Sequence, residues 1–157
     1  MDKIQSLKGM IDLIANRSDP DDFAESIFRT EDALKNIFVN FGYSEIRTPT
    51  LEDADLFKRS VGDSSDIVNK ELYSFFDKNE KNITLRPENT AGVIRSVIEK
   101  KIDANTHKFW YLGPMWRYER PQKGRYRQFN QAGIEIIGHP EGVAELEIIS
   151  MICSINN

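Results

Sequence analysis

The side chains with the clearest chemical potential lie between Phe109 and Glu135, where arginines alternate with aromatic residues. Five basic residues fall within the eleven positions from 117 to 127, opposed only by Glu119: Arg117, Arg120, Lys123, Arg125 and Arg127. Arginine offers a planar fork to phosphate oxygens, and a carboxylate can accept a hydrogen bond from an exocyclic amine. Because strand side chains alternate, Arg117 and Glu119 are expected on one face. The pattern predicts a site for a polyphosphate and a flat ring, with an ordinary cross-strand ion pair as the alternative.

The basic loop continues into a second strand. Arg125, Arg127 and Phe129 alternate along it and so share a face, where an aromatic ring could stack a nucleobase for about 1–3 kcal/mol. Core packing is the commoner role of a lone phenylalanine on a strand. A solvated hairpin tip would also explain the clustered charges.

Two polar side chains follow on the same face, on either side of a glycine. Gly133 is expected to leave room for a ligand between Gln131 and Glu135. Hydrogen bonds from these two residues would select a small polar molecule, because a wrong ligand would leave buried groups unpaired. A solvent-exposed sheet face is the alternative.

A second constellation occupies residues 84–90, where a predicted strand enters a helix through Pro87. Glu88 and Thr90 lie at the turn, and a carboxylate there could accept from an ammonium group. Helix capping by Glu88, which the helix dipole favours, is the alternative and the stronger interpretation on local grounds.

The remaining residues exclude several other chemistries. His107 and His139 are interpreted as surface residues, because neither has a partner at metal-ligand spacing. No P-loop or dinucleotide glycine fingerprint is present. The chemistry that is left is positioning and charge stabilisation, which phosphate-transfer-type reactions require.

Composition favours one soluble globular domain with a local anion site. The chain has 157 residues and a net charge of −4, yet residues 107–137 carry +4 and the remainder −8. This imbalance suits a defined anionic ligand better than non-specific polyanion binding. The lone Cys153, the absence of a signal peptide and the absence of a long apolar run predict a cytoplasmic protein without a membrane span.

Helical and extended patterns predict the elements that position these residues. A helix is expected to start with Asp19 as its cap and Pro20 in its first turn, and to end at Gly42. Its buried face is predicted from helical spacing to contain Phe23, Ile27, Leu34, Phe38 and Phe41. Tyr43–Leu51 is expected to be extended, with Pro49 marking an edge or an interface.

The rest of the chain predicts an α+β fold in which an antiparallel β-sheet is flanked by helices. Residues 72–76 and 83–85 read as a hairpin, and a helix from Pro87 to about Lys101 should turn Val93, Val97 and Ile98 inward. The long strand pair is expected at residues 109–118 and 127–137. A last helix should begin at Glu141, with an apolar stripe formed by Val143, Leu146, Ile149 and Ile152.

Four segments, in this order, resemble the N-terminal part of a histidyl-tRNA synthetase, a class II aminoacyl-tRNA synthetase. Residues 7–12 resemble the N-terminal signature, with Lys8 where arginine is usual. GYSEIRTP resembles motif 1, TLRPENTA the segment that binds the substrate amine, and WRYERPQKGRYRQFNQAGIE motif 2. Motif 1 would lie around residues 42–51 and motif 2 around residues 109–137, within a class II catalytic core that is partial.

The resemblance implies an ATP site. Arg117 would contact the α-phosphate of ATP and the histidine carboxylate, and so steady the pentavalent transition state. Glu119 would receive the adenine amino group, Phe129 would stack on adenine, and Arg125 would hold the γ-phosphate. Mg2+ is expected to accompany ATP, and no protein-bound metal site is expected.

The resemblance also implies a histidine site and contact with tRNA(His). Glu135 would bind the imidazole, as one of a set consisting of Glu88, Asn89, Thr90, Arg117, Gln131 and Glu135. Arg120 and Gln122 would lie near the acceptor end of the tRNA. A homodimer is expected through the motif 1 region.

Residues 1–157 are expected to form the N-terminal portion of a class II catalytic domain, without motif 3 or an anticodon-binding domain. The chain is thus expected to be a fragment with about half of the adenylation site, inactive alone, whose parent enzyme would form histidyl-adenylate and transfer histidine to tRNA. Two alternatives are a regulatory paralogue of the ATP phosphoribosyltransferase regulatory subunit type and a truncated binding or dimerisation module.

Overall fold

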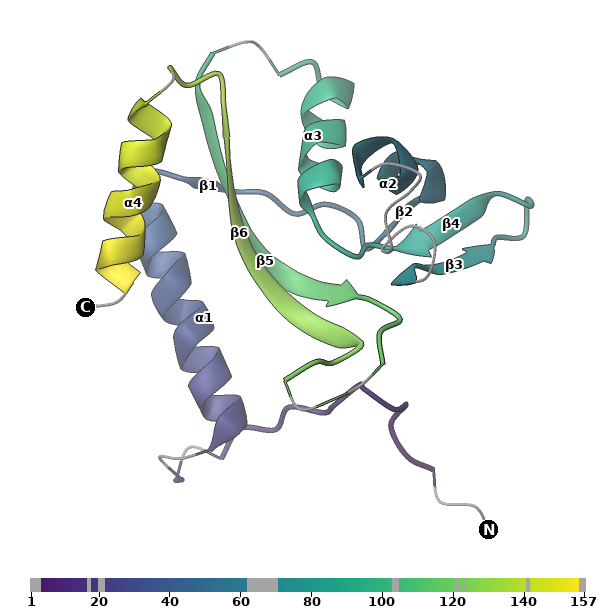
Figure 1. The fold of residues 1–157 in the computed structure, drawn as a ribbon. Coiled ribbons are helices and arrows are strands. Elements are labelled where there is room, and N and C mark those ends of the chain that lie inside the picture. Colours follow the sequence, from purple (N-terminus) through teal and green to yellow (C-terminus); the bar gives the residue numbers. More distant parts are fainter. Residues whose placement is uncertain are drawn as a thin grey trace. The chain divides into compact units, whose positions relative to one another are not determined.

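The computed structural model describes residues 4–16, 18–19, 22–61, 71–102, 105–120, 122, 124–140 and 142–155. The chain forms two compact units. Unit 1 comprises Met1–Asp12, Arg47–Lys100 and Gly113–Gln131, and unit 2 comprises Leu13–Ile46, Lys101–Leu112 and Ala132–Asn157. The mixture of helices and small sheets confirms the predicted α+β class (Figure 1). Predictions made for three residues lie outside the described ones: Pro20, Lys123 and Glu141.

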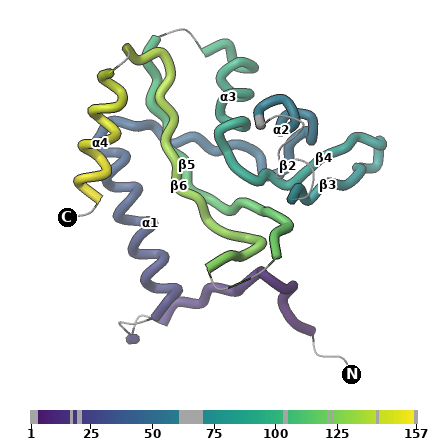
Figure 2. Tube along the Cα trace, in the orientation of Figure 1, coloured from purple at the N-terminus to yellow at the C-terminus, as the bar shows by residue number. Residues whose placement is uncertain are grey.

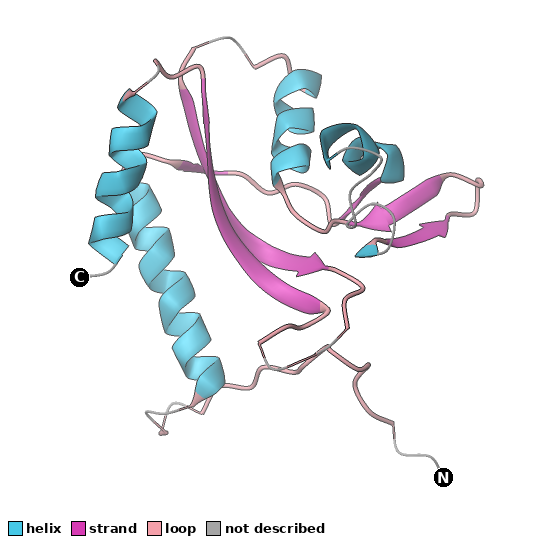
Figure 3. Cartoon of the chain, in the orientation of Figure 1, coloured by secondary structure: helices cyan, strands magenta, loops and turns pink. Residues whose placement is uncertain are grey.

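Unit 1 contains a three-stranded antiparallel sheet with the order β2–β4–β3. β2 covers Leu51–Asp53, β3 covers Tyr73–Phe76 and β4 covers Asn82–Leu85. The predicted hairpin of β3 and β4 is therefore confirmed (Figure 3). Asp77 closes its turn, because Oδ1 accepts hydrogen bonds from the amides of Asn79 and Lys81 at 2.8 and 2.9 Å.

Two helices complete unit 1, α2 (Ala54–Val61) and α3 (Thr90–Glu99). Phe57 and Val93 are fully buried. The predicted start of α3 at Pro87 is wrong by three residues, because Asn89 occupies the N-cap position. The inward placement of Ile98 is also wrong, since its side chain is 71% exposed. At about 100° per residue, Ile98 lies roughly 140° around the helix from Val93.

Unit 2 contains α1 (Phe23–Asn40), β1 (Ser44–Glu45) and α4 (Val143–Ile155). Its core consists of Phe38, Tyr43, Trp110 and Met151, and the rings of Phe38 and Trp110 lie 5.7 Å apart. The path of these elements can be followed along the Cα trace (Figure 2).

The start of α1 differs from the prediction. Asp22, not Asp19, is the N-cap, and its Oδ1 accepts a hydrogen bond from the amide of Glu25 at 2.7 Å. Phe23 is 57% exposed, so its predicted burial is wrong, and Ala24 is buried in its place. The predicted end is confirmed: Gly42 follows the C-cap with a φ of 78°, a conformation that glycine adopts without strain.

The predicted apolar stripe of α4 is not buried. Val143, Leu146, Ile149 and Ile152 are 48–70% exposed, and Met151 is the buried residue. A step of three residues falls about 60° short of a full turn, so these four positions spread over half of the helix circumference. Their spacing therefore does not define one face.

The two long strands, β5 (His107–Trp116) and β6 (Gln128–Ile137), are neighbours as predicted, with boundaries shifted by one or two residues. Each strand contributes residues to both units. β1 pairs with β5 in parallel, with Ser44 opposite Phe109, so this sheet is not purely antiparallel. Pro49 lies in the irregular stretch between β1 and β2, where no ladder N–H is required.

Candidate functional site

The turn between β4 and α3, in unit 1, carries the first group of candidate residues. Glu88 caps the helix with both carboxylate oxygens, since Oε2 accepts from the amide of Thr90 at 2.6 Å and Oε1 from the amide of Ala91 at 3.1 Å. The capping alternative is therefore confirmed. Each oxygen has further acceptor capacity, so capping leaves Glu88 able to receive a ligand N–H.

Asn89, which the sequence predicts to bind histidine, is almost completely buried. It is 1% exposed, and its Oδ1 accepts hydrogen bonds from the hydroxyl of Thr48 and from Nη1 of Arg86, the latter at 3.4 Å. The oxygen of this side chain thus serves the turn itself. Thr90, by contrast, is exposed at the first position of α3.

Arg117 follows β5, and its side chain contacts both the turn and Phe129 of β6. Its Nε donates to the carbonyl of Pro87 at 2.9 Å, and its Cζ lies 5.2 Å from the centre of the Phe129 ring. The terminal nitrogens of this fork make no hydrogen bond to the part of the chain that the structure describes. A guanidinium that is fixed at Nε and open at its end is suited to an anion such as phosphate or carboxylate.

Glu119 pairs with Arg125 and not with Arg117. Nη1 of Arg125 lies 3.1 Å from Oε2 of Glu119, with side chains 63% and 16% exposed, respectively. The two groups predicted for the γ-phosphate and the adenine amine therefore neutralise each other. An ion pair with one exposed partner is weak, so a strongly charged anionic ligand could take the place of Glu119 beside Arg125.

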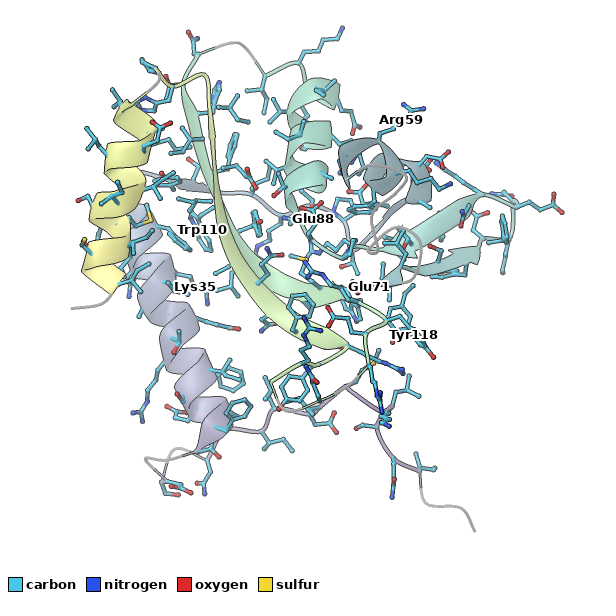
Figure 4. All side chains as sticks on the ribbon, viewed as in Figure 1. Lys35, Arg59, Glu71, Glu88, Trp110 and Tyr118 are labelled. Carbon is cyan, nitrogen blue, oxygen red and sulfur yellow. The ribbon has the colours of Figure 1, made fainter. Side chains whose placement is uncertain are left out.

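Arg127 differs from Arg117 because its guanidinium contacts a backbone carbonyl and an aromatic ring of the loop itself. Nε donates to the carbonyl of Glu119 at 3.1 Å, and Cζ lies 4.0 Å from the centre of the Tyr118 ring. Tyr118 in turn meets Tyr73 edge to face, with ring centres 5.4 Å apart. Figure 4 shows the side chain of Tyr118 beside this part of unit 1.

The tip of the basic loop presents the two residues predicted for the tRNA acceptor end. Arg120 and Gln122 are both exposed. The backbones of Gln122 and Arg125 exchange two hydrogen bonds, of 2.9 and 3.3 Å, across a turn in which Gly124 has a φ of 79°. Glycine is needed there because other residues rarely adopt this left-handed conformation.

Gln131, at the end of the unit 1 part of β6, has an unusual side chain. Its Oε1 is buried and has no hydrogen-bond partner among the described residues. A buried amide oxygen without a partner is costly, so native structures usually supply one. A ligand N–H is one such partner.

Gly133 and Glu135 belong to unit 2, and the predicted vacancy above Gly133 is filled by protein. A Cβ built on Gly133 would lie 2.3 Å from Cζ of Tyr111, whose side chain is buried. The glycine therefore accommodates Tyr111, and the prediction that its space receives a ligand is wrong. Glu135 is partly buried, and its role stays a prediction.

Several features of unit 1 escaped sequence reasoning. The carbonyl of Gly9 accepts from the amides of Arg127 and Gln128 at 2.7 and 3.3 Å, so the N-terminal segment holds the base of the loop. Arg86 is 7% exposed and contacts three separate segments. The sequence gives no separate signal for these roles, although Gly9 lies in the N-terminal signature at residues 7–12 and Arg86 in the segment at residues 84–90.

Unit 1 also contains a largely apolar groove of about 940 Å3 between α2 and α3. Glu88 and Thr90 lie among its lining residues, which are Leu56, Arg59, Ser60, Glu88, Thr90, Ala91, Ile94, Arg95, Ile98 and Glu99. Figure 4 labels Arg59 and Glu88.

Within the described ranges, no group of three or more histidine, cysteine, aspartate or glutamate side chains is placed to hold a metal ion. None of the helices in the described part of the chain has the length and apolar character needed to cross a bilayer.

Comparison with known sequences gives a consistent result. A family model described as histidyl-tRNA synthetase matches residues 18–157. The chain is 50% identical to a histidine–tRNA ligase of Legionella pneumophila (strain Lens) over 153 residues, which cover 96% of this chain and 34% of that protein. A histidine–tRNA ligase of Staphylococcus aureus (strain JH9) is 52% identical over 128 residues, which cover 80% of this chain and 30% of that protein. The chain spans about a third of the length of these curated relatives.

Two solved structures are similar to the chain. The crystal structure of apo S. aureus histidyl-tRNA synthetase matches with a TM-score of 0.75 and 36% identity, over 98% of this chain and 34% of that one. A Bacillus halodurans protein, described as an ATP phosphoribosyltransferase regulatory subunit/histidyl-tRNA synthetase, matches with a TM-score of 0.77 and 25% identity, over 99% of this chain and 38% of that one.

Proposed function

Because this chain belongs to the histidyl-tRNA synthetase family, we propose that it supplies part of the site in which a histidine–tRNA ligase activates histidine with ATP. The histidine carboxylate would attack the α-phosphorus of ATP, the bond to the β-phosphate would break, and histidyl-adenylate and pyrophosphate would form. The histidyl group would then pass to tRNA(His). Mg2+ would enter with ATP as part of the substrate.

One observation carries this proposal: four groups suited to ATP belong to unit 1 and form two contacting pairs. Arg117 faces the Phe129 ring at 5.2 Å, and Glu119 and Arg125 form a 3.1 Å ion pair close by in sequence. Arg117 would bind the α-phosphate and the histidine carboxylate, and Phe129 would stack on adenine. Arg125 would exchange Glu119 for the γ-phosphate, which releases the Glu119 carboxylate to accept from the adenine amine.

A second set of residues would bind histidine. Gln131, whose buried Oε1 has no hydrogen-bond partner among the residues that the structure describes, and Glu88 would accept from the α-ammonium group, with Thr90 beside them and Asn89 supporting the turn. Glu135 would bind the imidazole. The exposed side chains of Arg120 and Gln122 would meet the acceptor end of the tRNA.

The assembly and location proposed for the protein follow from the same family. We propose a cytoplasmic homodimer that forms through residues 42–51, in which the 45% exposed side chain of Leu51 would be covered. Sedimentation equilibrium tests this directly, and a monomer at micromolar concentration would contradict it.

Histidine-dependent exchange of pyrophosphate into ATP tests the activation step. The assay uses the natural gene product that contains this chain, expressed to its own stop codon, with each of the other amino acids as controls. Exchange with histidine alone would support the proposal. Histidine binding without exchange would favour the alternative of a regulatory paralogue. The similarity to the B. halodurans protein is the observation that supports this alternative. Absence of both would reject the histidine site.

A further inference from the structure

Arg86 is a buried arginine in unit 1 whose side chain is bonded to the protein itself. It is 7% exposed, and its guanidinium donates to oxygens of two segments that are distant in sequence, at Thr48 and Pro114, and to Asn89 three residues further on. Nε donates to the carbonyl of Pro114 at 3.1 Å. Nη1 donates to the carbonyl of Thr48 at 3.0 Å, to its hydroxyl at 3.2 Å and to Oδ1 of Asn89 at 3.4 Å. The five N–H groups of a rigid planar fork make such a multiple contact possible, and lysine offers no equivalent.

Gly113 of β5 leaves the space that the guanidinium of Arg86 occupies. A Cβ added to Gly113 would lie 2.9 Å from Nη2 of Arg86, so a larger residue at Gly113 would push the guanidinium away. The backbone is fixed as well, because the amide of Arg86 donates to the carbonyl of Thr50 and its carbonyl accepts from the amide of Trp116, both at 3.0 Å. Arg86 is therefore held on both its side chain and its main chain.

The residues that follow Arg86 are those that present the candidate ligands. Pro87 is buried, and its carbonyl holds Nε of Arg117 at 2.9 Å. Glu88 begins α3 by capping Thr90 and Ala91, and Asn89 is bound to Arg86 itself. Any shift of Arg86 is thus passed on to Arg117 through one peptide bond and to Glu88 through two.

We propose that Arg86 is a positioning residue for the adenylation site: it sets the Pro87 carbonyl that orients Arg117, together with the turn that presents Glu88. The inference rests on the proposed function, since it assigns Arg86 to the same site. Orientation matters most in the transition state, where a misplacement of about 1 Å can cost on the order of 10²-fold in rate. Arg86 therefore acts on kcat more than on KM.

The test compares two conservative substitutions in the natural gene product that contains this chain. Arg86→Lys keeps the charge and removes the fork, and Arg86→Met removes both. Arg29→Lys is the matched control, because it makes the same change of side chain in α1 of unit 2, where Nε of Arg29 joins Glu25 at 3.1 Å. We expect Arg86→Lys and Arg86→Met to lower kcat for histidine-dependent exchange about 10²-fold, with little change in the KM for ATP, and Arg29→Lys to leave kcat unchanged. A wild-type kcat in Arg86→Lys, or equal losses of kcat in the Arg86 and Arg29 variants, would overturn the proposal.

A second readout does not depend on activity. Amide hydrogen exchange should become faster at residues 88–91 and 113–117 in Arg86→Lys and stay as in the wild type at these residues in Arg29→Lys. Unchanged exchange at residues 88–91 would refute the positioning role. If the wild type shows no histidine-dependent activity, the proposed function fails, and this readout still decides whether Arg86 orders the turn.

A milder substitution covers the case in which the Arg86 variants do not fold. Thr48→Val removes one hydroxyl acceptor of Arg86 and keeps the size of the side chain. The expected change is in the same direction and smaller, a severalfold loss in kcat with faster amide exchange at residues 88–91. Wild-type values for both would contradict the proposal.

Discussion

Two buried or half-buried cations, Arg86 in unit 1 and Lys108 in unit 2, hold their surroundings in different ways. Arg86 distributes its hydrogen bonds over Thr48, Asn89 and Pro114. Lys108 concentrates on one carboxylate and one helix end: Nζ lies 3.0 and 3.2 Å from the two oxygens of Glu147, and it donates to the carbonyl of Phe41 at 2.6 Å. Its ammonium also lies 4.9 Å from the centre of the Tyr43 ring.

The difference follows from the chemistry of the two side chains. A guanidinium is a planar fork that imposes directions on several partners at once, whereas an ammonium is a compact charge that attracts partners without fixing their orientation. Arg86 is thus suited to setting the geometry of a site, and Lys108 to tying α1, β5 and α4 into a stable scaffold. Substitutions in unit 1 should therefore affect chemistry first, and substitutions around Lys108 should affect stability first.

The largest effect is expected for Arg117→Ala. Loss of one charge-stabilising donor at a transition state typically costs about 10²–10³-fold in kcat, and Arg117 would contact both substrates. The free energy of unfolding should change little, because only Nε of Arg117 is bonded within the described residues. Pyrophosphate exchange and chemical denaturation of the same variant measure both. Retained activity would remove Arg117 from the proposed ATP site.

Lys108→Met should be the most destabilising change on the unit 2 side of the comparison. It leaves the Glu147 carboxylate without its cation, and hydrogen bonds to charged groups contribute about 1.5–3 kcal/mol. Lys35→Met is the control, because Lys35 forms an exposed ion pair with Asp32 on α1 at 3.0 Å, and exposed pairs contribute about 0–1 kcal/mol. Urea denaturation compares the two. Equal losses in the free energy of unfolding of the two variants would show that Lys108 contributes no more than an exposed ion pair does.

The same cluster should make unit 2 sensitive to acid. Burial raises the pKa of Glu147, but its neighbours Tyr43, Lys108 and His139 outweigh this, and the net pKa lies below its usual value of 4.5. A carboxyl whose folded pKa is depressed stabilises the protein at neutral pH, and this contribution is lost as the pH falls below about 4.5 towards the folded pKa. Glu147→Gln should therefore lower stability at pH 7 and flatten its decline in acid. A variant with the wild-type pH profile would exclude Glu147 as the source.

The smallest effect is expected for Glu88→Gln, which separates capping from ligand binding. The amide retains one oxygen that can accept from a helix N–H, so the stability loss should stay below the ~1 kcal/mol typical of losing a cap. Histidine affinity should fall more clearly, because the charge that would attract the ammonium group is gone. Isothermal titration with histidine measures this, and unchanged affinity would leave Glu88 as a cap alone.

The sequence predicted local features of both units correctly. The hairpin of β3 and β4, the end of α1 at Gly42 and the long strands β5 and β6 follow from turn residues and alternation, which act over a few neighbouring positions. Arg117 and Phe129 contact each other in unit 1, and their shared role in a ligand site stays a prediction. The start of α1 and the buried faces of α3 and α4 were predicted less well, because several acidic residues could cap and apolar spacing alone does not identify the covered face.

The amino-acid sequence is enough to identify the chemical groups: a basic and aromatic segment from Phe109 to Glu135, a helix-opening turn at residues 84–90, and the family to which the chain belongs. Which of those groups pair with one another depends on the tertiary fold. Glu119 faces Arg125, Gly133 makes room for Tyr111, and Arg86 reaches Thr48, Asn89 and Pro114. Most of these contacts join residues that are distant in the chain, and they depend on which side chain fills a given space. Periodicity and propensity describe only neighbours along the chain, so they carry no information about such partners.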